Sequence, residues 1–156
     1  MLIVFDRKGI YFTWRRTSIG DIMGHGLASA LLVSSLLSNI RSESFSECSP
    51  KEILQRVNRY LIRDVRTPMF VTAGLVLADQ SQQTITYAGA GHPFPYLINK
   101  SGVQEIELPS IPLGVDAQAV FEQMTVSMQP HDILVLYTDG LVEGEIARCL
   151  WSAFDT

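Results

Sequence analysis

The sequence predicts an α+β domain built around antiparallel sheet, and three observations support this fold class. Two helical patterns come together in the first half of the chain, and six strand patterns follow them with no helix between. Segregation of helices from strands is typical of α+β folds. The gaps between strands are short turn sequences, so neighbouring strands are expected to run antiparallel. The 156 residues suffice for one domain with a sizeable core.

Two short strand patterns, residues 2–5 and 10–14, precede the helices. Residues 27–41 are predicted to form a helix, because apolar side chains recur there at three-to-four spacing. A second helix begins after Ser49, with Pro50 at its first position and Glu52 completing a capping box, and it ends before Thr67-Pro68. Its predicted core face is Ile53, Leu54, Val57, Leu61 and Val65, and its predicted solvent face is Lys51, Gln55, Arg56, Asn58, Arg59 and Arg63.

The second half of the chain is rich in strand patterns. The predicted strands are residues 69–79, 84–91, 94–98, 103–108, 120–128 and 132–138. Several are nearly continuous apolar runs, which is typical of strands covered on both faces.

Composition and charge exclude several classes of protein. An apolar content of 47% with 18% charged residues indicates a folded globular domain. A net charge of -4 provides no general basic field for nucleic acid or an anionic membrane. No apolar run reaches the roughly 20 residues of a transmembrane span, and no signal peptide is expected. Cys48 and Cys149 lack metal-site spacing and are interpreted as free thiols of a cytoplasmic protein.

Two aspartates are the leading candidates for chemistry. Asp21 lies among glycines before the first helix, where a carboxylate is either a metal ligand or a helix N-cap. Asp139 follows an apolar strand, where it is either a metal ligand or part of an ordinary Asp-Gly turn. Together they could begin a site for a hard cation such as Mg²⁺ or Mn²⁺. His25, His92 and His131 lack the spacing of a zinc site.

Five segments occur in an order that matches a known family: GDIMGHGLASALL, FVTAGLVLAD, ITYAGAGHPFPYLI, IPLGV and DILVLYTDGLVE. Together they resemble the bacterial stage II sporulation E-type metal-dependent protein phosphatases, which belong to the protein phosphatase 2C-like (PPM) superfamily. The likeness runs over residues 20–143, and residues 1–156 are accordingly predicted to be a single PPM-type domain. The resemblance implies a four-layer α-β-β-α sandwich, in which helices flank two antiparallel sheets.

The resemblance also implies an activity, which is hydrolysis of phosphoserine or phosphothreonine on a protein with two Mn²⁺ or Mg²⁺ ions. Asp21 would bridge both ions, the carbonyl of Ile22 would bind one, and Asp139 would bind the other side of the cluster. His25 would lie beside the metals or the phosphate. The implied substrate is a phosphorylated regulatory protein of the anti-anti-sigma-factor type, and an upstream sensor domain or a dimer would provide regulation.

The sequence departs from the family pattern at both ends. It has no G-G-D motif upstream of Asp21, where Asp6 is the only acid and Ile3 occupies the position expected for the first aspartate. The sequence continues for 17 residues after Asp139, and Asp155 comes too early to match the family's final acidic motif. A sandwich that is incomplete at both ends is therefore expected. The alternatives are a catalytically inactive or truncated phosphatase-like domain that acts in binding or regulation, and an α+β domain whose Asp-Gly sequences are only turns.

Overall fold

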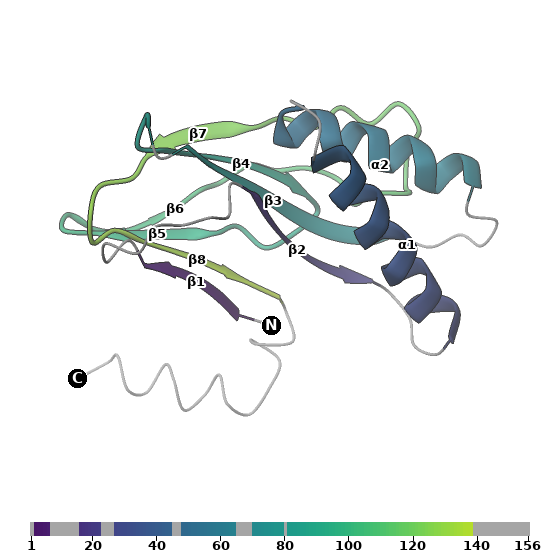
Figure 1. Cartoon of the computed structure of the whole chain (residues 1–156), viewed down its shortest axis with the longest axis horizontal. Helices are drawn as coiled ribbons and strands as arrows, with labels where there is room; N and C mark the ends of the chain where they lie inside the picture. Colours follow the sequence, from purple (N-terminus) through teal and green to yellow (C-terminus); the bar gives the residue numbers. More distant parts are fainter. Residues whose placement is uncertain are drawn as a thin grey trace.

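A computed structural model of the chain describes residues 2–6, 16–22, 27–44, 48–64, 70–79 and 81–138. It confirms an α+β fold with two antiparallel sheets (Figure 1). The helices are α1 (Leu27–Ser44) and α2 (Pro50–Asp64). The strands are β1 (Leu2–Asp6), β2 (Arg16–Ile22), β3 (Val71–Asp79), β4 (Thr84–Ala90), β5 (Tyr96–Asn99), β6 (Gly102–Glu105), β7 (Met124–Ser127) and β8 (Ile133–Tyr137).

The strands form two four-stranded sheets that lie face to face. One sheet has the order β2-β3-β4-β7 and the other β1-β8-β5-β6, and every pair is antiparallel. Both helices pack on the outer side of the β2-β3-β4-β7 sheet (Figure 1). The described residues therefore form three layers in the order α, β, β. The second helical layer of the expected four-layer sandwich is not among them.

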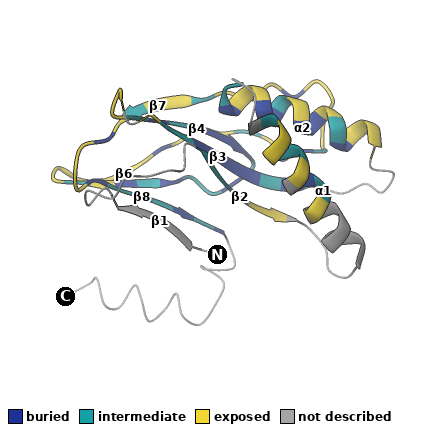
Figure 2. Cartoon of the chain, viewed as in Figure 1, coloured by how far each residue is buried: buried dark blue, intermediate teal, exposed yellow. Residues whose placement is uncertain are grey.

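The core has two parts, one on each side of the β2-β3-β4-β7 sheet. Alternate residues of a strand face opposite sides of a sheet. Accordingly, Ala73 and Leu75 of β3 pack against the helices, whereas Val76 faces the second sheet. Figure 2 shows β3 and β4 as the most continuously buried strands. The prediction that the apolar strands are covered on both faces is confirmed for these two.

The start of α2 confirms the part of the predicted capping box that Glu52 makes. The backbone N–H of Ser49 donates to the Glu52 carboxylate at 2.7 Å, and the Ser49 hydroxyl donates to the same oxygen at 2.8 Å. The predicted core face of α2 is confirmed for Ile53, Leu54, Val57 and Leu61, all of which are buried. Val65 lies outside the described residues.

The prediction that Asn58 faces solvent is wrong. Its side chain is fully buried between α2 and the loop that precedes β7. The Asn58 amide donates to the carbonyl of Asp116 at 2.9 Å and accepts the N–H of Gly114 at 2.8 Å. A buried amide is stable only when its polar atoms are paired, and these two bonds fasten the loop to the helix.

The segment around Asp21 also differs from the sequence prediction. The predicted strand at residues 10–14 lies outside the described residues, and β2 instead spans Arg16–Ile22. Asp21 is therefore part of a strand and pairs with Thr72, whereas α1 begins only at Leu27. The helix N-cap interpretation of Asp21 is wrong. Gly20 accounts for the close pairing, because a Cβ atom there would lie 2.9 Å from the Thr72 carbonyl oxygen.

The structure also bears on the predictions about membrane spans and cysteines. No helix in the described ranges is long and apolar enough to cross a membrane. Cys48 is a free, half-buried thiol, as predicted, and Cys149 lies outside the described residues.

Candidate functional site

Asp21 lies near the C-terminal end of β2, one of the two edge strands of its sheet in the described residues. Ile19, two residues earlier, is buried between the two sheets. Because side chains two apart on a strand share a face, Asp21 is on the face that looks toward the second sheet. Asp21 is exposed, in contrast to Ile19. The strand thus presents a carboxylate at the open end of the space between the sheets.

The backbone carbonyl of Ile22 is directed away from β3. Ile22 is opposite Val71 in the β2–β3 pair, but both the N–H and the C=O of Val71 bond to Leu113, at 3.1 and 2.9 Å. In an antiparallel pair, residues whose polar groups point away from each other form a non-hydrogen-bonded pair. The Ile22 carbonyl is therefore directed toward the open edge of the sheet. Asp21 and Ile22 thus provide a carboxylate and a backbone carbonyl, two possible metal ligands, at consecutive positions.

Thr72 connects this strand end to a buried histidine. The Thr72 hydroxyl is 3.5 Å from the Asp21 carbonyl oxygen and 3.2 Å from Nδ1 of His92. A hydroxyl has one proton to donate. If that proton goes to the Asp21 carbonyl, Nδ1 of His92 must be the protonated nitrogen that donates to Thr72. His92 is only 5% exposed, so its ring is held within the protein.

The turn that carries His92 is fixed by Ser110. The N–H of Gly91 donates to the Ser110 hydroxyl at 3.1 Å, and that hydroxyl donates to the carbonyl of Gly89 at 2.8 Å. Gly91 has φ +60, and a Cβ atom there would lie 2.6 Å from the ring of Pro112. Neither Thr72 nor Ser110 is among the candidate residues that the sequence predicts. The available signal was that Thr72 lies within the segment FVTAGLVLAD and that Ser110 directly precedes IPLGV.

The structure leaves part of the predicted site undescribed. His25 and Asp139 lie outside the described residues, as does Asp155. Thr138, the residue before Asp139, is buried at the end of β8. Figure 1 shows β2 and β8, one from each sheet, running toward the same side of the molecule. His131 is exposed in a turn.

Asp6 lies far from the end of β8. It pairs with Ile133 at the start of that strand, whereas Ile3 pairs with Leu136 near its end. Four strand positions separate Ile133 from Tyr137, or about 13 Å. Asp6, the only acidic residue before Asp21 in the sequence, is therefore displaced from the C-terminal end of β8. Asp139 follows that end of the strand in the sequence.

The donor chemistry at the end of β2 fits a hard divalent cation. Mg²⁺ and Mn²⁺ prefer carboxylate and carbonyl oxygens, and Asp21 and Ile22 supply one of each. No group of three or more His, Cys, Asp or Glu side chains in the described ranges could hold a metal ion. Further carboxylates for such an ion would have to come from residues outside the described ranges. Asp139, the second predicted ligand, is one of these residues.

Comparisons with known proteins show the family and the fold of this chain. The family model described as stage II sporulation protein E (SpoIIE) matches residues 15–153. The chain is 30% identical over 128 residues to the phosphoserine phosphatase RsbP of Bacillus subtilis, an alignment that covers 79% of this chain and 32% of that protein. The chain thus spans about a third of the length of this relative.

Two solved structures have the same fold. A crystal structure of the RsbU and RsbW domains of Rv1364c from Mycobacterium tuberculosis matches with a TM-score of 0.69 and 26% identity, over 82% of this chain and 36% of that one. The PP2C phosphatase domain of SpoIIE from Bacillus subtilis, solved with a fragment of its regulatory domain, matches with a TM-score of 0.72 and 16% identity, over 92% of this chain and 46% of that one. At 16% identity the second likeness concerns the fold alone.

Proposed function

The chain belongs to the stage II sporulation protein E (SpoIIE) family, and we propose that it is a PPM-type domain that hydrolyses phosphoserine or phosphothreonine on a protein. One observation carries the proposal: the exposed Asp21 carboxylate and the outward Ile22 carbonyl lie together at the end of an edge strand, within the matched segment. The phosphoserine phosphatase activity named for RsbP supports the same reaction here.

The residues have distinct roles in this proposal. Asp21 and the Ile22 carbonyl would hold Mn²⁺ or Mg²⁺, and Asp139, which follows β8 in the sequence, would contribute a further carboxylate. When bound, the ions activate water as a nucleophile and offset negative charge on the phosphoryl group. The ladder to β3 keeps the backbone of Asp21 in place, and the Thr72 hydroxyl reinforces it through the Asp21 carbonyl. His25 beside the phosphate stays a prediction.

The proposed substrate is a phosphorylated regulatory protein of the anti-anti-sigma-factor type. Two likenesses support a place in a partner-switching pathway, one to RsbP and one to a protein that contains RsbU and RsbW domains. The expected cytoplasmic location, and regulation by an upstream sensor domain or a dimer, remain predictions.

The test is a phosphatase assay on a serine-phosphorylated protein and on an aryl phosphate, with and without Mn²⁺ or Mg²⁺. Turnover should require the metal and should fall more than about a hundredfold in Asp21→Asn and Asp139→Asn. Asp79→Asn, at the far end of β3, is the matched control and should retain activity. Metal-independent turnover would contradict the proposal. A folded protein with no turnover in either metal would favour the inactive binding domain instead.

A further inference from the structure

The segment 110–116, which contains the IPLGV sequence, is fixed beside the strand end that carries Asp21. Val71 of β3 lies between the two. It pairs with Ile22 on one side and exchanges two backbone hydrogen bonds with Leu113 on the other, at 3.1 and 2.9 Å. Adjacent strands are about 4.8 Å apart, so the backbone of Leu113 lies roughly 10 Å from that of Ile22. The segment is therefore part of the surroundings of the proposed metal site.

The same segment is held at both of its ends. At its start, the Ser110 hydroxyl is hydrogen-bonded to the backbone of the turn after β4. At its end, the Asn58 side chain of α2 accepts the N–H of Gly114 at 2.8 Å and donates to the carbonyl of Asp116 at 2.9 Å. A partner would therefore meet a preformed surface, which lowers the cost of binding.

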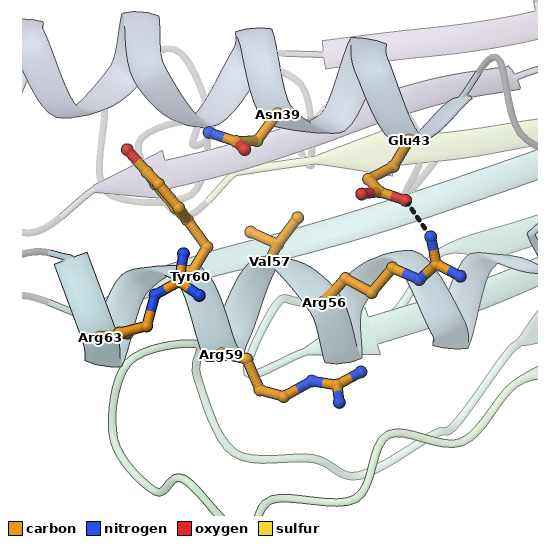
Figure 3. Close-up of a pocket in the computed structure, with 7 residues that line it drawn as sticks. All are labelled: Asn39, Glu43, Arg56, Val57, Arg59, Tyr60 and Arg63. Carbon is orange, nitrogen blue, oxygen red and sulfur yellow. Dashed lines mark hydrogen bonds and ion pairs between the residues drawn. The ribbon is translucent and has the colours of Figure 1, made fainter.

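The helix that carries Asn58 is in turn fixed against α1. Figure 3 shows Arg56 of α2 directed toward Glu43 of α1, and the guanidinium donates to the carboxylate at 2.7 Å. The hydroxyls of Ser35 on α1 and Tyr60 on α2 lie 2.6 Å apart. The support of the segment thus extends through α2 to α1.

Two apolar side chains of this fixed segment are exposed. Ile111 is 42% exposed and Val115 is 57% exposed, although Leu113 between them is fully buried. Ile62 of α2, which is 39% exposed, is expected beside them, because it follows Asn58 by about one turn on the side of the helix that contacts the segment. Single apolar residues are normal on a protein surface, whereas a group of them on a fixed support is typical of an interaction site.

From this placement we propose that Ile62, Ile111 and Val115 bind an apolar side chain of the phosphorylated protein, near its phosphoserine or phosphothreonine. The proposal rests on the phosphatase function proposed above and adds a sequence preference to it. A polypeptide that leaves the metal site across β3 reaches Leu113 after roughly 10 Å, which an extended chain spans in about three residues. The preferred apolar residue is therefore about three or four positions from the phosphorylated one.

The size of this surface favours a peptide over a second copy of the chain. Three aliphatic side chains match one or two residues of an extended segment, whereas a stable interface between proteins takes about 20 to 30 residues on each side. A phosphorylated protein held at the metal site necessarily presents the residues that flank its phosphate. Contact with the apolar surface would add to the binding of the phosphate.

The test compares two peptides with a central phosphoserine as substrates in the presence of Mn²⁺ or Mg²⁺. One peptide has leucine at the third and fourth positions on both sides of the phosphoserine, and the other has serine there. We expect kcat/KM to be about tenfold higher for the leucine peptide, the gain from burial of one aliphatic side chain. Ile111→Ser combined with Val115→Ser should remove this preference and leave turnover of an aryl phosphate unchanged. Val103→Ser, at a similarly exposed valine on β6 of the other sheet, is the matched control and should keep the preference.

Several outcomes would overturn the proposal. These are equal kcat/KM for the two peptides, a preference that survives in the double variant, or the same loss in Val103→Ser. A double variant that sediments as a smaller assembly than the unchanged protein would also overturn it, by showing that the surface joins two copies of the chain.

Failure of the phosphatase function has a different signature, because the aryl phosphate would then not be hydrolysed either. In that case fluorescence anisotropy of the labelled leucine peptide tests the surface by itself. Binding that the double variant weakens about tenfold would support the docking surface. Equal binding by the double variant and the unchanged protein would contradict it.

Discussion

Nδ1 of His92 lies 3.2 Å from the hydroxyl of Thr72, which in turn lies 3.5 Å from the carbonyl oxygen of Asp21. The contact links the Gly-His-Pro turn after β4 to the strand that carries the proposed metal ligand. His92 thereby has a role that its position in a turn does not reveal: it helps to hold Thr72 against β2.

Thr72→Val keeps the shape of the side chain but removes the hydroxyl. The free energy of unfolding should fall by about 1–3 kcal/mol, because Nδ1 of the buried His92 loses this partner. If Asp21 binds metal, the Mn²⁺ concentration for half-maximal activity should rise about tenfold or more, as for other groups that support a metal ligand. Chemical denaturation and a Mn²⁺ titration measure the two effects.

Thr125→Val is the control for this prediction. Thr125 is exposed on β7, in the same sheet, and its hydroxyl lies 2.9 Å from that of Thr86. This substitution should leave the Mn²⁺ titration unchanged. Equal Mn²⁺ titrations for Thr72→Val and the unchanged protein would show that Thr72 does not support Asp21.

Local sequence chemistry predicted some of these features and could not predict others. The capping box of α2 was visible because Ser49 and Glu52 are three residues apart and interact with each other. The contacts of Thr72 could not be predicted in this way, because its partners Asp21 and His92 lie 51 and 20 residues away in the sequence. Only the pairing of β2 with β3, and of β3 with β4, brings them together.

The region of Asp21 shows how pairing can override a local pattern. The glycines around it favour a turn, and a turn before a helix would make Asp21 an N-cap. In the structure, Gly20 instead permits a close approach to Thr72, so β2 continues to Ile22. The motif made Asp21 a candidate metal ligand, which stays a prediction, but its place in a strand could be known only from the strand register.

Asn58→Leu should destabilise the protein by about 2–4 kcal/mol. The substitution removes both bonds of a fully buried amide and leaves the Gly114 N–H and the Asp116 carbonyl without their partner. Urea unfolding measures the loss. Lys51→Leu, on the exposed side of the same helix, serves as the control. A change within about 0.5 kcal/mol for Asn58→Leu, the range of an ordinary surface substitution, would mean that the loop does not depend on this anchor.

Tyr87→Phe should stabilise the protein by about 1 kcal/mol at neutral pH. Tyr87 is buried between the sheets, and its hydroxyl has no hydrogen-bond partner among the described residues. An unpaired buried hydroxyl costs free energy that phenylalanine avoids. Tyr96→Phe is the control, because the Tyr96 hydroxyl has Glu105 and Tyr137 as partners, and it should give no such gain. A loss of stability in Tyr87→Phe would indicate that this hydroxyl is paired in solution.

The same substitution should alter the response to alkaline pH. Burial, assisted by the nearby Tyr137, raises the pKa of Tyr87 above its ordinary value of about 10. Above pH 10 the unfolded chain therefore releases a proton that the folded protein retains, and stability falls as the pH rises. Tyr87→Phe lacks this contribution, so its advantage over the unchanged protein should grow between pH 9 and pH 11. Thermal unfolding across that range measures it, and an advantage that does not change with pH would contradict the assignment.

Glu52→Gln should lower the thermal unfolding midpoint at pH 7 but not in acid. Bonds from the N–H and the hydroxyl of Ser49 lower the pKa of Glu52 below its ordinary value of 4.5. A carboxyl whose pKa is lower in the folded state contributes stability above its unfolded pKa, and that contribution is lost as the pH falls through the folded value. The difference between the variant and the unchanged protein should therefore be full at pH 7 and disappear toward pH 3.

Circular dichroism melts at pH 7, 5, 4 and 3 measure this difference, with Glu122→Gln as the control at an exposed glutamate outside the capping box. The control should track the unchanged protein at every pH. If the effect of Glu52→Gln is equally large at pH 3 and pH 7, the charge of Glu52 does not stabilise α2. The capping box would then act through hydrogen bonds of the neutral carboxyl group that the amide of glutamine does not reproduce.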